Sequence, residues 1–87
     1  MKFSVLGCGR WGSFISWYLS DIKNYDTCLY GRATSANYLQ LKNTRQNEYV
    51  KLNDNITLTS DLSVALNFAD IVIISISAQN LREFIRN

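Results

Sequence analysis

The hydrophobic and polar positions of this chain form two alternating patterns. Short runs rich in apolar and β-branched residues predict strands, and segments in which apolar residues recur three and four positions apart predict helices. The expected strands are Lys2–Leu6, Asp26–Tyr30, residues 56–59 and Ile71–Ile74, the last within the apolar segment 69–77. The expected helices are residues 11–20, 35–42, 61–68 and 78–86.

The ends and faces of these helices carry further signals. Ser35 or Thr34 is expected to cap the second helix, and Ser60 or Asp61 the third. In the first helix, the residues that recur at helical spacing are Trp11, Phe14, Ile15, Tyr18 and Leu19. The polar segment 43–55 contains no glycine or proline, which predicts an ordered loop and not a flexible linker.

Strands that alternate with helices indicate an α/β fold in which right-handed crossovers join the strands of a parallel sheet. We expect about four strands in the order 3-2-1-4, with helices on both faces. Ligands of such sheets bind beyond the carboxyl ends of the strands. There the turns at residues 7–12, 31–32 and 75–79 are expected to converge.

The first of these turns reads Gly7-Cys8-Gly9-Arg10-Trp11-Gly12, directly behind an expected strand and before an expected helix. In this context the G-x-G-x-x-G pattern predicts a Rossmann-like dinucleotide site. Gly7 would permit the tight turn, Gly9 would let a pyrophosphate approach the backbone, and Gly12 would let the helix lie close to the sheet. The alternative is a glycine-rich turn that binds nothing.

The end of the second strand bears on which dinucleotide binds. A dinucleotide fold that prefers NAD carries an acidic residue about 20 positions past the glycines, and here Arg32 stands 20 positions after Gly12. An arginine suits a 2′-phosphate, so the sequence favours NADP without excluding NAD; the alternative is a solvated surface arginine. Arg10 would add to the phosphate site or point to water. Trp11 would be a core anchor or part of the cofactor wall, and Trp17, on another face, is interpreted as packing.

Composition narrows the remaining possibilities. The 87 residues predict one small domain, and a net charge of +2 with no basic run argues against a nucleic-acid partner. No apolar run is long enough for a signal peptide or a membrane span, so we expect a cytoplasmic protein. The chain has no histidine, and its cysteines, Cys8 and Cys28, lack metal-ligand spacing. We therefore expect buried thiols, no metal site and no catalytic group within the chain.

The motifs resemble a known family, the bacterial NAD(P)-dependent glycerol-3-phosphate dehydrogenases. The tryptophan before the third glycine, Trp11, is fairly specific to it. The segments that carry the resemblance are residues 4–12, 29–32, 47–52, 59–62, 65–66, 69–72 and 79–83. The chain differs from the family at Arg10, which replaces a small Ser or Ala, at Cys8, which replaces Ala, at Val50-Lys51, which replace Leu-Pro, and at Ser77, which replaces Pro.

This resemblance implies an enzyme that reduces dihydroxyacetone phosphate with NAD(P)H to sn-glycerol 3-phosphate, the precursor of phospholipids. By position it implies that Arg10, Trp11, Gly31 and Arg32 contact the cofactor, and it adds Tyr49 to that set. The family's catalytic lysines lie beyond the segment that this chain resembles. Residues 1–87 are therefore expected to be the N-terminal part of the NAD(P)-binding domain, without the catalytic C-terminal domain and inactive alone.

Two alternatives stay open from the sequence: the Rossmann half of another reductase, such as ketopantoate reductase or a nucleotide-sugar dehydrogenase, and a non-catalytic nucleotide-sensing module. The strand Ile71–Ile74 would lie at a sheet edge with unpaired backbone groups. We therefore expect the chain to self-associate through that edge.

Overall fold

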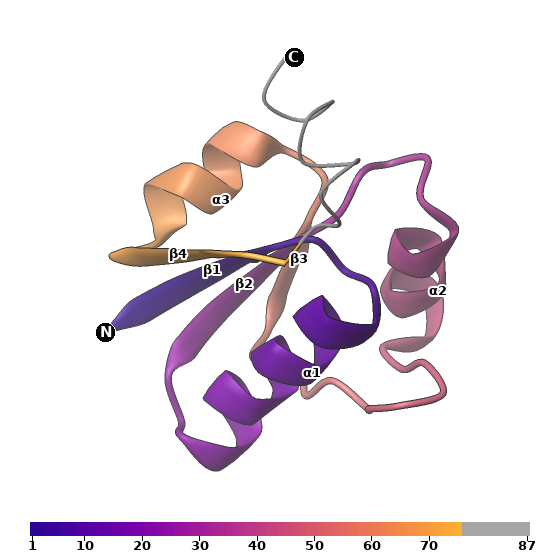
Figure 1. The fold of residues 1–87 in the computed structure, drawn as a ribbon, viewed down its shortest axis with the longest axis horizontal. Coiled ribbons are helices and arrows are strands. Elements are labelled where there is room, and N and C mark those ends of the chain that lie inside the picture. Colours follow the sequence, from indigo (N-terminus) through magenta and orange to yellow (C-terminus); the bar gives the residue numbers. More distant parts are fainter. Residues whose placement is uncertain (76–87) are drawn as a thin grey trace.

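The computed structural model describes residues 1–75 (Figure 1). Its elements, in chain order, are β1 (Lys2–Leu6), α1 (Arg10–Trp17), the π-helical turn η1 (Tyr18–Ile22), β2 (Asp26–Tyr30), α2 (Ala36–Thr44), β3 (Thr57–Thr59), α3 (Leu62–Phe68) and β4 (Ile71–Ile74). The helix expected at residues 78–86 lies outside the described residues. None of the helices within residues 1–75 has the length and apolar character that a membrane crossing requires.

The strands form one four-stranded sheet in the order β3-β2-β1-β4. Every neighbouring pair is parallel, and Val5 of β1 lies opposite Leu29 of β2 on one side and Ile73 of β4 on the other. Helices α1 and α2 lie on one face of the sheet and α3 on the other (Figure 1). The predicted α/β class, strand order and two-sided cover are confirmed.

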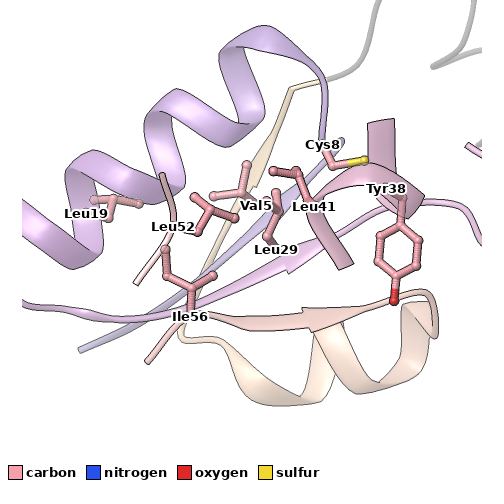
Figure 2. Close-up of a cluster of buried hydrophobic side chains, with 8 residues drawn as sticks. All are labelled: Val5, Cys8, Leu19, Leu29, Tyr38, Leu41, Leu52 and Ile56. Carbon is pink, nitrogen blue, oxygen red and sulfur yellow. The ribbon is translucent and has the colours of Figure 1, made fainter. Parts of the chain in front are cut away.

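The two faces of the sheet carry separate cores, because side chains alternate along each strand. On the α1 and α2 face, Val5 and Leu29 meet residues from the helices and from the connection between α2 and β3 (Figure 2). The members of this cluster are Val5, Cys8, Leu19, Leu29, Tyr38, Leu41, Leu52 and Ile56. On the α3 face the core is smaller and consists of Leu6, Cys28 and Ala65.

Only part of the apolar face predicted for the first helix is buried: Ile15 of α1 and Leu19 of η1 pack in the larger core cluster. Trp11, Phe14 and Tyr18 are exposed, at 65%, 42% and 40%. The buried positions of α1 are the small residues Gly12, Ser13 and Ser16. The structure thus overturns the interpretation of Trp11 as a core anchor, whereas Trp17 packs against the core as expected.

The helix boundaries follow the capping signals. Ser35 Oγ accepts a hydrogen bond from the Tyr38 N–H, and Asp61 caps α3 by accepting from the Ser63 N–H, which decides between the two candidate caps in each case. Helix α2 ends at Thr44, and its C-cap Arg45 has a left-handed φ of 61°. Helix α1 is shorter than expected, but η1 continues the helical path to Ile22.

The connection between α2 and β3 is ordered, as predicted. Arg45 Nη2 donates to the carbonyl oxygens of Asn53 and Ile56, both at 2.6 Å. Leu52 and Ile56 are each 2% exposed and belong to the larger core cluster. Hydrogen bonds to its backbone and the burial of its apolar side chains therefore both hold the connection in place.

Candidate nucleotide-binding site

The turns that follow the parallel strands lie side by side at one edge of the sheet. The Gly7 N–H donates to the Tyr30 carbonyl at 2.9 Å, and the Gly31 N–H donates to the Thr59 carbonyl at 3.1 Å. The Ser75 N–H donates to the Leu6 carbonyl at 2.8 Å. The turns at 7–12 and 31–32 therefore meet the start of the turn at 75–79, whose remainder lies outside the described residues.

Two of the three glycines of the 7–12 turn are required by the conformation or the packing of the turn. Gly7 has a φ of 113°, a conformation that residues with a side chain rarely adopt. A Cβ on Gly12 would collide with the Gly7 carbonyl oxygen, so only glycine lets α1 begin this close to β1. Gly9 is different, because its backbone is extended, with a φ of −76°, and a Cβ would find no neighbour closer than Asn37 Nδ2 at 3.7 Å. Nothing in the described protein requires a glycine at position 9.

The N-terminus of α1 opens beside Gly9. Gly9 is the N-cap, no side chain among residues 1–75 caps this helix end, and the first turn contains no acidic residue. The unpaired N–H groups and the positive end of the helix dipole favour an anion there. A pyrophosphate brought against Gly9 would meet these donors.

Beside this helix end, Arg10 lies among aromatic rings. Its guanidinium carbon is 5.0 Å from the Tyr49 ring centre and 5.8 Å from that of Trp11, within the range of cation–π contacts. A hollow of about 410 Å³ is lined by Arg10, Trp11, Phe14, Glu48 and Tyr49. Three of the residues expected to contact the cofactor, Arg10, Trp11 and Tyr49, are thus brought together.

The other two expected residues, Gly31 and Arg32, lie at the end of β2. A Cβ on Gly31 would collide with Cys8 Sγ and would approach Tyr38 Cδ1 to 2.8 Å, so packing alone accounts for this glycine. Arg32 follows it on the surface, and the Arg32 carbonyl accepts a hydrogen bond from the Ser35 N–H at 2.9 Å. This position leaves the Arg32 side chain at the edge where the strands end.

The cysteines lie in the interior of the protein, as predicted. Both are free and buried, and burial raises the pKa of each thiol above its ordinary value. Cys8 Sγ lies 3.9 Å from Ser35 Oγ and packs in the core of the α1 face. Within residues 1–75, the cysteine and acidic side chains form no group of three that could hold a metal.

Sequence reasoning missed the polar residues that hold the site together. Asn47 Nδ2 donates to Ser13 Oγ at 2.9 Å and so joins the loop that carries Tyr49 to the first turn of α1. Arg45 fixes the rest of that loop through the bonds described above. An asparagine or arginine in a polar segment carries no local signal of such a role, because each partner is distant in sequence.

Comparison with known proteins decides the family. The sequence profile described as "NAD-dependent glycerol-3-phosphate dehydrogenase N-terminus" matches residues 2–87. The chain belongs to this glycerol-3-phosphate dehydrogenase family. The family match decides against the alternative of another reductase's Rossmann half.

Curated relatives in the glycerol-3-phosphate dehydrogenase family bear the name "Glycerol-3-phosphate dehydrogenase [NAD(P)+]". The protein of Syntrophomonas wolfei is 37% identical over 86 residues, which cover 94% of this chain and 24% of the relative. That of Lactobacillus helveticus is 37% identical over 99% of this chain and 26% of the relative, and that of Bacillus subtilis is 28% identical over 98% and 25%. The chain thus spans about a quarter of the length of these relatives. No solved structure matches it.

Proposed function

We propose that this chain supplies the NAD(P)H-binding part of a glycerol-3-phosphate dehydrogenase that reduces dihydroxyacetone phosphate to sn-glycerol 3-phosphate for phospholipid synthesis. The observation that carries the proposal is Gly9. Neither the backbone conformation nor the packing of the described residues requires a glycine at this position, which lies at the open N-terminus of α1. A ligand that approaches the backbone at this point gives that reason.

The residues of the proposed cofactor site have separate tasks. Gly7 and Gly12 shape the turn, and Gly9 leaves room for the pyrophosphate. Arg10, Trp11 and Tyr49 form the cationic and aromatic wall beside it, while Gly31 and Arg32 lie at the end of β2, on the side proposed for the adenosine. When bound, the nicotinamide supplies the hydride. The groups that act on the substrate belong to the catalytic domain that this proposal places beyond residue 87, so residues 1–87 alone are inactive.

The proposal extends to cofactor preference and location. Arg32 is a cation where an acidic residue would hold the ribose hydroxyls of NAD, which favours NADP. Free, buried Cys8 and Cys28 fit a reducing compartment, and we place the enzyme in the cytoplasm.

Self-association through β4 is also part of the proposal. β4 ends the strand order at one edge of the sheet, and its Ile71 and Ile74 are 41% and 54% exposed. Light scattering of the purified 87-residue chain over a range of concentrations is expected to give a mass above that of the monomer. A monomer at every concentration would contradict this part of the proposal.

The test of the cofactor site substitutes Gly9 in the full-length protein. Gly9→Ala and Gly9→Val place one and three carbons where the pyrophosphate is proposed to lie, and the structure has room for the first of these, the Cβ. We expect NADPH affinity, measured by fluorescence titration, to fall at least about tenfold, which corresponds to about 1.4 kcal/mol. Circular dichroism melting is the control for folding. Folded variants that bind NADPH as tightly as the wild type would refute the site.

A further inference from the structure

The segment between α2 and β3 contains a tight turn that Asn47 organises. Gln46 and Lys51 form an antiparallel bridge, and the Asn47 N–H donates to the Val50 carbonyl at 3.0 Å. Asn47 Oδ1 accepts from the N–H groups of Tyr49 and Val50, both at 2.9 Å. One side-chain oxygen therefore fixes the backbone that carries Tyr49.

The other end of the same amide attaches this turn to the glycine loop. Asn47 Nδ2 donates to Ser13 Oγ at 2.9 Å. Ser13 is fully buried, and its hydroxyl in turn donates to the Gly9 carbonyl at 2.7 Å, with the Arg10 carbonyl at 3.1 Å. A short chain of hydrogen bonds thus runs from the turn to the N-cap of α1.

This attachment bears on the position of the residues that line the hollow. Tyr49 is 50% exposed and Arg10 is also exposed, yet their ring and guanidinium lie 5.0 Å apart. Cation–π contacts at exposed sites contribute only about 0.5–1 kcal/mol. Such a contact is too weak to hold a loop by itself. The Asn47 amide and the Ser13 hydroxyl join the turn to α1, and Val50 beside Tyr49 packs against the core.

We propose that Asn47, together with Ser13, is a positioning residue for NAD(P)H binding: it holds the 46–51 turn against the first turn of α1, so that Tyr49 and Arg10 are pre-arranged beside the proposed pyrophosphate position. This role rests on the cofactor site proposed above. A wall that is already ordered costs less conformational entropy when a ligand binds, so its loss weakens affinity without removing a direct contact.

The chain offers a matched control in the same connection. Asn53 Nδ2 donates to Ser20 Oγ at 2.9 Å and to Asp21 Oδ1 at 2.7 Å, and Asn53 Oδ1 accepts from the Asn55 N–H. Asn53 therefore joins the far end of the connection to η1 with a similar set of bonds. It lies away from the glycine turn and from the hollow.

The experiment measures NADPH dissociation constants and melting temperatures for Asn47→Ala, Ser13→Ala and Asn53→Ala in the full-length protein. Asn47→Ala is expected to raise the dissociation constant about tenfold, Ser13→Ala by a smaller factor in the same direction, and Asn53→Ala by less than twofold. The melting temperatures of the two asparagine variants are expected to fall by similar amounts. Ser13→Ala changes the side-chain volume little, so this variant takes the place of Asn47→Ala in the test if Asn47→Ala does not fold.

A double-mutant cycle separates positioning from general destabilisation. If Asn47 acts through Tyr49, then Asn47→Ala in a Tyr49→Ala background should raise the dissociation constant less than twofold further. Equal losses of affinity in Asn47→Ala and Asn53→Ala, or full additivity with Tyr49→Ala, would overturn the positioning role while leaving the proposed function intact. A wild-type protein that does not bind NADPH would overturn both.

Discussion

Replacing Gly12 by alanine tests how closely α1 approaches the sheet. The added Cβ would lie 2.7 Å from the Gly7 carbonyl carbon and would collide with its oxygen. Because carbon atoms are best separated by about 3.5–4.0 Å and the oxygen lies closer still, the start of α1 must retreat by more than about 1 Å. That movement would strain the interface at which Ser13 and Ser16 are fully buried. We expect a loss of about 3 kcal/mol in the free energy of unfolding, the upper part of the range for overpacked cores.

Urea-induced unfolding of the full-length protein, followed by circular dichroism, measures this loss. Gly9→Ala is the matched control, since it adds the same methyl group three residues earlier, where there is room for it. Alanine caps a helix less well than glycine but restricts the unfolded chain more, and these opposing effects leave an expected change within about 1 kcal/mol. The reasoning is refuted if Gly12→Ala is as stable as Gly9→Ala.

Two further predictions concern charged side chains. Arg32→Ala in the full-length protein is expected to weaken NADPH binding by about 1.5–3 kcal/mol, the range for a hydrogen bond to a charged group, and NADH binding by much less; equal losses in calorimetry would exclude a role at the 2′-phosphate. Hydrogen bonds from the side chain and backbone of Ser63 hold the pKa of Asp61 below its ordinary value. The Asp61 carboxylate therefore stabilises the folded protein fully above about pH 3.9, the pKa of an unfolded aspartate. This stabilisation is lost as the pH falls through the lower pKa of the folded state. Asp61→Asn keeps a capping oxygen but removes the carboxylate. The wild type should therefore melt at a higher temperature than Asp61→Asn at pH 5, and this difference should shrink as the pH falls to 2.5. A difference that does not change with pH would contradict the prediction.

The strands and their order could be predicted because their signals are local. The apolar run at Ile71–Ile74 and the strand before Gly7 stand out from the polar segments around them. The handedness of parallel crossovers then leaves few topologies. The G-x-G-x-x-G pattern placed the candidate site at the end of β1, where the structure explains the glycines at positions 7 and 12 in different ways.

The buried face of α1 could not be predicted from the same signals. Helical spacing of Trp11, Phe14 and Tyr18 predicts a helix, but the absence of a side chain at Gly12 draws this helix so near the sheet that only small residues fit between them. Trp11 and Phe14 are therefore turned outward, whereas Ile15 and Trp17 pack against the core. Burial of serine follows from this short distance and from the carbonyls that accept its hydroxyl, as Gly12 does for Ser16 at 2.8 Å.

The roles of Arg45, Asn47 and Asn53 could not be predicted from the sequence for a different reason. Asn47 bonds a residue 34 positions away and Asn53 one 33 positions away. Arg45 spans the connection to reach two backbone carbonyls. Contacts of this kind exist only after the sheet and helices have come together, so the sequence predicted an ordered loop but not the side chains that order it.

The most direct test of the central claim is a crystal structure of the full-length protein with NADPH. We predict that the pyrophosphate lies against Gly9, with its oxygens about 3 Å from backbone nitrogens in the first turn of α1. Arg10 and Tyr49 should border it, and the 2′-phosphate should lie beside Arg32. A dinucleotide bound with its pyrophosphate away from the 7–12 turn would contradict the account.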